Sequence, residues 1–311
     1  MANDTLLRGL FVPIVTPFDS SGAVAVDDLE ELAGRFLDAG AAGIVALGTT
    51  GESATLESKE KQMVVEACAR ACEPRLAPLV VGAGSNDTRA SVAAARSLGS
   101  MPGVVACLTV VPYYVRPSEA GIVEHFKVLA EASPVPLVIY NIPYRTGRGL
   151  GPASILELAR TDGVIGLKQA TGALDGDTLE LLAAAPARFS VLAGDDAFIL
   201  PTVLLGGAGA IAASSHVCTE HFVEMIDAAL GGRLDEGRAR AEALYPVVRS
   251  LFAEPNPSVI KGVLHAQGLI PTADLRLPMT AASVQAVDHA LELIEQAEQV
   301  LRSAPEATSS P

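Results

Sequence analysis

The residue with the clearest chemical potential in this sequence is Lys168, which closes the apolar run Val164-Ile165-Gly166-Leu167-Lys168. A short apolar run of this kind is typical of a fully buried strand. Burial disfavours the charged ammonium and favours the neutral amine, which is a nucleophile. An isolated lysine at a strand end usually extends its side chain to solvent instead. The interpretation therefore depends on which residues lie at the other strand ends.

An earlier apolar run is followed by the sequence Gly48-Thr49-Thr50-Gly51-Glu52-Ser53. Glycines allow a sharp turn that exposes backbone N–H groups, and the threonines add hydroxyl groups. An ordinary turn requires the glycines but not two adjacent threonines. We therefore predict that this segment binds a carboxylate.

Tyrosine is scarce in this sequence, and its distribution is uneven. Of the five tyrosines, Tyr113, Tyr114 and Tyr140 lie at the ends of two predicted strands, and Tyr144 follows soon after. A single tyrosine at such a position would be interpreted as a packing residue. Three at the same edge, facing Lys168 and the threonine turn, indicate a hydroxyl relay for proton transfer.

Arg145 follows directly, and its planar guanidinium can hold a carboxylate through two parallel hydrogen bonds. A neutral lysine, a carboxylate-binding turn and tyrosine hydroxyls together predict a Schiff base between Lys168 and a 2-oxo acid. The imine withdraws electrons when a proton leaves the adjacent carbon, and the resulting enamine attacks an aldehyde. This chemistry requires neither a metal nor an organic cofactor.

Two features of the sequence raise the question of a metal site, and neither favours one. Asp195 and Asp196 form a carboxylate pair, but they precede a helix that is expected to begin near Ala197, so helix capping is the preferred interpretation. His216 and His221 match no HExxH or facial-triad spacing. We interpret them as ordinary helix residues and expect no metal.

Eight short apolar runs must position these residues. They cover residues 10–14, 43–47, 79–81, 104–110, 137–140, 164–168, 189–193 and 210–213. Amphipathic segments lie between them, including 27–39, 59–72, 88–98 and 119–132. Strict alternation of buried strand and helix predicts parallel pairing, and eight units predict an α/β fold of the (β/α)8 TIM barrel type.

A doubly wound open sheet is the structural alternative, and it usually has a glycine-rich dinucleotide fingerprint in its first turn. That turn lacks the fingerprint here, and the later Gly82-Ala83-Gly84 lacks the third glycine. In a barrel, the active site lies at the C-terminal ends of the strands. The barrel therefore brings Lys168, the tyrosines and the threonine turn together.

We predict three parts of the chain. Residues 1–216 form the barrel core, and residues 217–302 hold the last barrel helix and a small C-terminal helical region. This second part is expected to be helical throughout, except where Glu254-Pro255-Asn256-Pro257 interrupts the pattern. A helix is expected to restart near Ser258, and a last helix to cover 282–301. The polar tail 303–311 is predicted to be disordered.

Composition limits the classes of partner. The chain has 311 residues, half of them hydrophobic, and a formal net charge of −14, which argues against nucleic acid. Four cysteines, Cys68, Cys72, Cys107 and Cys218, offer no second pair for a zinc site and are interpreted as free thiols. We find no signal peptide and no apolar run of about 18 residues. We expect a cytoplasmic protein with no membrane partner.

Seven motifs in this order resemble those of the 4-hydroxy-tetrahydrodipicolinate synthase (dihydrodipicolinate synthase) family. They occupy residues 48–56, 108–114, 140–147, 166–172, 194–196, 254–257 and 275–280, and the resemblance covers nearly all of 8–280. The family belongs to a superfamily of Schiff-base aldolases that includes N-acetylneuraminate lyase. Within it, Thr49-Thr50 and Arg145 favour the synthase, since sialate lyases usually have Ser-Thr in the turn and lack the arginine.

The resemblance implies condensation of pyruvate with L-aspartate 4-semialdehyde in lysine and diaminopimelate biosynthesis, without a cofactor. It implies that Lys168 forms the imine, that Tyr140 moves the proton, and that Thr49 links Tyr140 to Tyr114 of a neighbouring subunit. Substrate-binding roles are implied for Thr50, Gly51, Arg145, Gly194 and Ile211. A homotetramer built from two tight dimers is also implied. Two alternatives remain: a related lyase acting on another 2-oxo acid or aldehyde, and a non-enzymatic relative that binds an oxo acid.

The sequence departs from the family pattern at several positions. Gln169 replaces a common glutamate, and Val115 replaces a usual asparagine. Lysine-sensitive relatives have two histidines and a glutamate in the effector cleft, where this chain has Ser58, Lys61 and Ala90. A remnant of that cleft persists in Ser53, Asn86 and Tyr113. Because the carboxylate for the effector's amine is missing and Lys61 adds like charge, we expect weak or absent inhibition by lysine.

Overall fold

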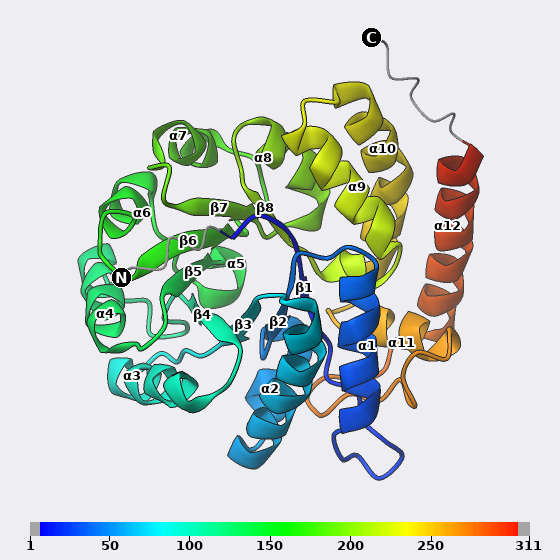
Figure 1. Cartoon of the computed structure of the whole chain (residues 1–311), viewed down its shortest axis with the longest axis horizontal. Coiled ribbons are helices and arrows are strands. Elements are labelled where there is room, and N and C mark those ends of the chain that lie inside the picture. Colours follow the sequence, from blue (N-terminus) through cyan, green and yellow to red (C-terminus); the bar gives the residue numbers. More distant parts are fainter. Residues whose placement is uncertain (1–6, 304–311) are drawn as a thin grey trace.

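A computed structural model of the chain describes residues 7–303, and eight parallel strands close into a barrel in chain order (Figure 1). Each strand pairs with the next, and the last pairs with the first. This confirms the predicted (β/α)8 barrel. The strands are β1 Gly9–Pro13, β2 Gly43–Ala46, β3 Leu79–Gly82, β4 Val104–Val110, β5 Leu137–Asn141, β6 Val164–Gln169, β7 Ser190–Ala193 and β8 Gly209–Ile211.

Both faces of the strands are buried, and for this reason they read as apolar runs without alternation. Within β2, Ile44 packs against the surrounding helices, whereas Val45 points into the barrel. The same alternation places Ile139 outside and Tyr140 inside, with Leu167 outside on β6. Since side chains alternate along a strand, Lys168 points inward beside Tyr140.

Helices surround the barrel and begin at local signals. Aspartate caps open two of them: the Asp87 side chain accepts a hydrogen bond from Arg89 N, and Asp175 accepts one from Thr178 N. The helices of this ring are α1 Val26–Asp38, α2 Ser58–Cys72, α3 Thr88–Ser97, α4 Glu119–Ala132, α6 Pro152–Leu158, α7 Gly176–Ala184, α8 Ile199–Leu204 and α9 Thr219–Leu230. The short helix α5 Pro143–Thr146 follows β5 and lies inside the ring (Figure 1).

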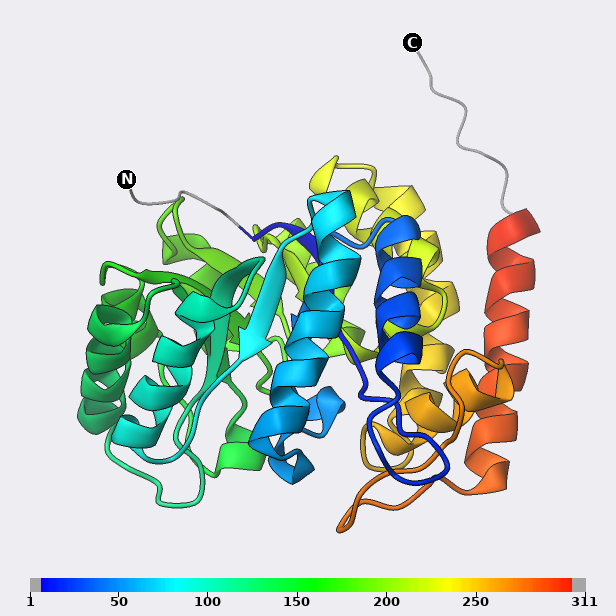
Figure 2. The same cartoon turned by 60° about the horizontal axis from the view of Figure 1, so that its bottom comes forward.

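The C-terminal region adds α10 Leu234–Leu251, α11 Ser258–Ala266 and α12 Val284–Ser303, and α12 forms the outer edge of the molecule (Figure 2). The expectation of a helical region interrupted only at 254–257 was wrong, because residues 268–283 form no helix. Gly268 has a left-handed backbone (φ 71°), which ends the helical pattern, and the segment then crosses to the barrel mouth.

One predicted boundary of this region differs from the structure by one residue. Ser303, assigned to the tail, is the last residue of α12, and residues 304–311 lie outside the described part of the chain. The division after residue 216 stays a prediction.

The four cysteines are free thiols, as expected: Cys68, Cys72, Cys107 and Cys218. Among residues 7–303, no helix is long and apolar enough to cross a membrane.

Candidate active site

A cavity of about 420 Å³ opens at the C-terminal ends of the strands. Loops after four of the first five strands line one side of it, and the C-terminal region supplies the other. The lining includes Thr49, Gly84, Tyr140, Arg145, Asn256 and Met279. Tyr140 lines the cavity and Lys168 does not, but the Lys168 Nζ lies 4.4 Å from the centroid of the Tyr140 ring.

Lys168 is the buried amine that the sequence predicted, and only 7% of its surface is exposed. Burial lowers its pKa from the ordinary 10.5 to about 8, while the charges of Asp196, Tyr144 and Asp195 oppose the shift. A Cβ atom at Gly194 would lie 2.9 Å from the lysine Cγ, so only glycine leaves room for this side chain. The Gly194 N–H donates to Gln169 O.

Tyr140 lies next to Lys168 in register on the neighbouring strand. Burial raises the pKa of its phenol, although the charge of Arg145 and a hydrogen bond with the Thr49 side chain oppose this shift. The phenol is therefore protonated at neutral pH and able to donate a proton. Ile211, at the end of β8, packs in the same interior cluster as Tyr140.

The threonine turn forms a short 3-10 helix, Thr49–Gly51, directly after β2. The first N–H groups of a helix have no hydrogen-bond partner within the helix. In this one they belong to Thr49 and Thr50. The Thr50 hydroxyl is buried and accepts a hydrogen bond from Asn256 Nδ2 at 3.0 Å. The turn thus offers N–H groups for a carboxylate, while the Thr50 hydroxyl is engaged from the C-terminal region.

Some of the other predicted site residues line the cavity, and Tyr114 does not. Arg145 and Tyr113 line it, and the Arg145 guanidinium stacks 5.5 Å from the centroid of the Tyr144 ring. Tyr114 does not line this cavity within one chain; it is 86% exposed and has a left-handed backbone (φ 71°). The predicted hydroxyl relay is therefore only partly assembled in a single copy of the described chain.

The prediction that Asp195 and Asp196 cap a helix was wrong. Both carboxylates instead bind the backbone of neighbouring loops: Asp195 Oδ2 accepts from Gly172 N at 2.6 Å, and Asp196 Oδ2 accepts from Ser214 N at 2.5 Å. The short helix that follows has no side-chain cap, and the Ser214 N–H offsets the cost of burying Asp196. Burial nevertheless raises the pKa of Asp196 to about 6.

Neither histidine that was considered as a ligand is free to serve as one. His216 is buried in a 3-10 helix, where Nε2 accepts from Val15 N and Nδ1 contacts Ala213 O. His221 lies in α9 beside Glu224. Within residues 7–303 no cluster of three or more histidine, cysteine or carboxylate side chains is placed to hold a metal ion.

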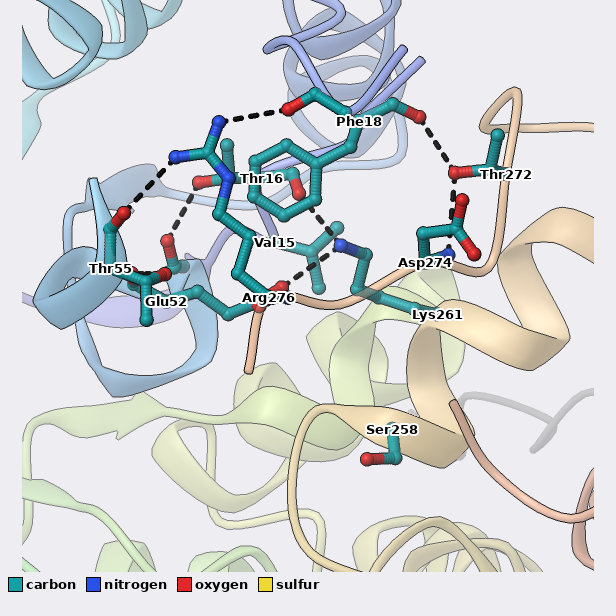
Figure 3. A network of polar contacts seen from close by, with 12 residues as sticks. Val15, Thr16, Phe18, Glu52, Thr55, Ser258, Lys261, Thr272, Asp274 and Arg276 are labelled. Carbon is teal, nitrogen blue, oxygen red and sulfur yellow. Dashed lines mark hydrogen bonds and ion pairs between the residues drawn. The ribbon is translucent and has the colours of Figure 1, made fainter. Parts of the chain in front are cut away.

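Sequence reasoning missed a buried ion pair beside the turn, between Glu52 and Lys261 (Figure 3). The Lys261 Nζ lies 2.9 Å from Glu52 Oε1, and the two side chains are 0% and 3% exposed. The backbone N–H of Arg276 donates to the other oxygen of Glu52. A signal existed in the sequence, since Lys261 interrupts the apolar segment Ser258–Leu264, as Lys168 closes a strand.

A sequence model described as the dihydrodipicolinate synthetase family matches residues 6–297. The chain belongs to this family. A 4-hydroxy-tetrahydrodipicolinate synthase of Enterococcus faecalis is 36% identical to it over 295 residues, which are 95% of this chain and 99% of the relative. The family model, which matches residues 6–297, spans the barrel and nearly all of the C-terminal helical region.

Solved structures of the family have the same fold. A chloride-inhibited dihydrodipicolinate synthase of Acinetobacter baumannii, complexed with pyruvate, is 32% identical, with a TM-score of 0.89 over 94% of this chain and 99% of that one. The synthase of Cyanidioschyzon merolae with lysine bound is 31% identical, with a TM-score of 0.89 over 94% of this chain and 98% of that one.

Gln169, one of the departures from the family pattern, is fully accommodated. Its Oε1 accepts a hydrogen bond from Asn141 Nδ2 at 3.0 Å, and its Nε2 donates to Thr178 Oγ1 at 3.3 Å. Asn141 in turn accepts from Leu150 N. An amide suits this position because it both donates and accepts, whereas a carboxylate could only accept from Thr178.

Proposed function

We propose that this chain condenses pyruvate with L-aspartate 4-semialdehyde to 4-hydroxy-tetrahydrodipicolinate. The observation that carries the proposal is the buried amine of Lys168, with a lowered pKa, beside the protonated phenol of Tyr140 at the cavity wall. The names of the family relatives and the pyruvate complex of one of them support the same substrates.

In the first step, the neutral Lys168 amine attacks the ketone carbon of pyruvate. Loss of water, to which Tyr140 supplies a proton, leaves a cationic imine. The pyruvate carboxylate binds at the N–H groups of the turn Thr49–Gly51. The hydrogen bond between Thr49 and Tyr140 then couples carboxylate binding to the position of the proton donor.

In the second step, the imine draws electrons from the pyruvate methyl group, which loses a proton and becomes an enamine. The enamine carbon attacks the aldehyde of the second substrate, whose carboxylate binds to the Arg145 guanidinium at the cavity mouth. The amine of the semialdehyde then displaces Lys168 from the imine carbon, which closes the ring and regenerates the enzyme.

Tyr114 supports a second part of the proposal, which concerns assembly. A large aromatic side chain that is 86% exposed beside the cavity mouth is suited to contact another copy of the chain. We place it in the neighbour's site, where it continues the proton path from Tyr140 and Thr49. This arrangement makes a dimer the active unit and a homotetramer of two dimers the expected assembly in the cytoplasm.

The test is the rate of condensation of the two substrates, coupled to the reductase that consumes the product. A turnover of about 1 per second or more is expected for the wild type. Arg145→Ala should lower kcat/KM for the semialdehyde about 100-fold and leave imine formation with pyruvate intact. If the wild type forms the imine with pyruvate but shows no condensation activity, the proposed Schiff-base chemistry stands and the proposed second substrate is refuted.

A further inference from the structure

The buried pair of Glu52 and Lys261 has no role in the proposed chemistry, yet it reaches the substrate turn from the C-terminal region. Lys261 lies on α11, and the pair spans 209 residues of sequence. Replacement of a buried ion pair by apolar residues of similar volume is often neutral or stabilising. Stability alone therefore does not account for two buried charges at this place.

Glu52 is attached directly to the turn. It follows Thr49–Gly51 with a left-handed backbone (φ 52°), and its N–H donates to Thr49 O at 3.2 Å. A non-glycine residue in this conformation is strained and needs surrounding contacts to hold it. The Glu52 side chain supplies them through Lys261 Nζ and the backbone N–H of Arg276.

Lys261 holds the turn from a second side. Its Nζ also donates to Thr16 O at 3.0 Å, and the Thr16 hydroxyl donates to Gly51 O at 2.7 Å. The aromatic ring of Phe18 lies 4.2 Å from Nζ and, as Figure 3 shows, separates it from the Arg276 side chain. One ammonium thus fixes both Glu52 and Thr16, which bond to opposite ends of the turn.

We propose that Lys261 is a positioning residue for pyruvate binding, because its ammonium sets the geometry of the turn Thr49–Gly51 through Glu52 and Thr16. This inference rests on the proposed function, in which the turn binds the pyruvate carboxylate. Lys261 touches no substrate. The C-terminal region thereby becomes part of the pyruvate site rather than an appendage of the barrel.

The experiment compares Lys261→Met, the double variant Glu52→Gln with Lys261→Met, and the control Leu129→Ala. Leu129 is buried in α4, away from the turn, so its truncation lowers thermal stability without moving the site. Borohydride trapping at varied pyruvate gives the apparent Kd for imine formation, and steady-state kinetics give KM for each substrate and kcat.

For Lys261→Met we expect KM for pyruvate and the apparent Kd to rise about 10-fold or more, because Glu52 is left buried and unpaired. KM for the semialdehyde and kcat should change less than about 3-fold. The double variant removes the unpaired carboxylate but still lacks the ammonium that holds the turn, so it should keep most of the rise in KM for pyruvate. Leu129→Ala should lower the melting temperature and leave KM for pyruvate unchanged.

Two results would overturn the proposal: a Lys261→Met variant that loses thermal stability but keeps its KM for pyruvate, or a control that raises KM as much. If Lys261→Met does not fold, Glu52→Gln alone decides, with an expected rise of about 3-fold in KM for pyruvate. Failure of the proposed function is seen separately, as a wild type that forms no imine with pyruvate.

Discussion

Two lysines, Lys168 and Lys261, are buried among residues 7–303, and their surroundings give them opposite chemistry. Lys261 lies against the Glu52 carboxylate at 2.9 Å. Lys168 has no ion pair within residues 7–303, and its amine faces the ring of Tyr140. Burial lowers the pKa of both amines, but Glu52 opposes the shift of Lys261 from within hydrogen-bonding distance.

The difference lies in what the nearby carboxylates are bound to. Asp195 and Asp196 act on Lys168 at longer range, and their oxygens are bound to the N–H groups of Gly172 and Ser214. The negative charges of these aspartates partly oppose the lowering of the Lys168 pKa, but neither aspartate forms an ion pair with the amine. A buried lysine therefore serves as a nucleophile where its amine is left unpaired, and as a fixed charge where a carboxylate contacts it.

Replacement of Lys168 should have the largest effect. We expect Lys168→Met to lower kcat by at least about 10⁴-fold, because no imine can form. Thermal stability should not fall, since the change removes an unpaired buried amine. Loss of borohydride trapping with pyruvate, read by mass spectrometry of the intact chain, checks this. A trapped adduct in the variant would place the nucleophile on another lysine and break the comparison.

Replacement of Tyr140, the proposed proton donor, should have the next largest effect. Tyr140→Phe keeps the ring beside Lys168 and removes only the hydroxyl, so we expect kcat to fall about 10²- to 10³-fold. The melting temperature should change little. Single-turnover rates of imine formation measure the step directly. An unchanged rate would show that Tyr140 covers the amine without moving protons.

The pH dependence of imine formation sharpens the comparison further. Because burial lowers the pKa of Lys168 to about 8, the reactive neutral amine increases about tenfold per pH unit below that value and saturates above it. The rate of trapping should therefore rise with pH and level off near 8. A rate that still rises up to pH 10 would indicate an ordinary lysine.

The smallest effect concerns free lysine as an inhibitor. An ammonium that binds in a protein needs a contacting carboxylate, as Lys261 has in Glu52. Ser53 and Tyr113, two residues of the predicted cleft remnant, line the cavity. Ala90 stands where the resemblance implies a carboxylate in lysine-sensitive relatives, so we expect less than about twofold inhibition at submillimolar lysine. Initial rates with added lysine test this. Ala90→Glu is the matched variant that should increase inhibition.

Much of the fold was predictable because each strand carries its own signal. Eight apolar runs predicted eight strands to within a few residues, and the parallel barrel followed from their alternation with helices. The hydrogen bonds that Asp195 and Asp196 make in place of helix capping were not predictable, because their partners Gly172 and Ser214 come from other strand ends. The irregular segment 268–283 was missed because it is held in place by contacts with distant parts of the chain, such as that of Arg276 with Glu52.

The sequence by itself determined the barrel, the buried strand that carries Lys168, and the tight turn at Thr49–Gly51, because all three depend on local pattern and residue type. Only the tertiary structure decided which buried lysine is paired. Glu52 and Lys261 are 209 residues apart, and a contact over that separation depends on how the whole barrel closes. The chemical state of a buried amine is set by neighbours within a few ångströms, and those neighbours are chosen by the fold.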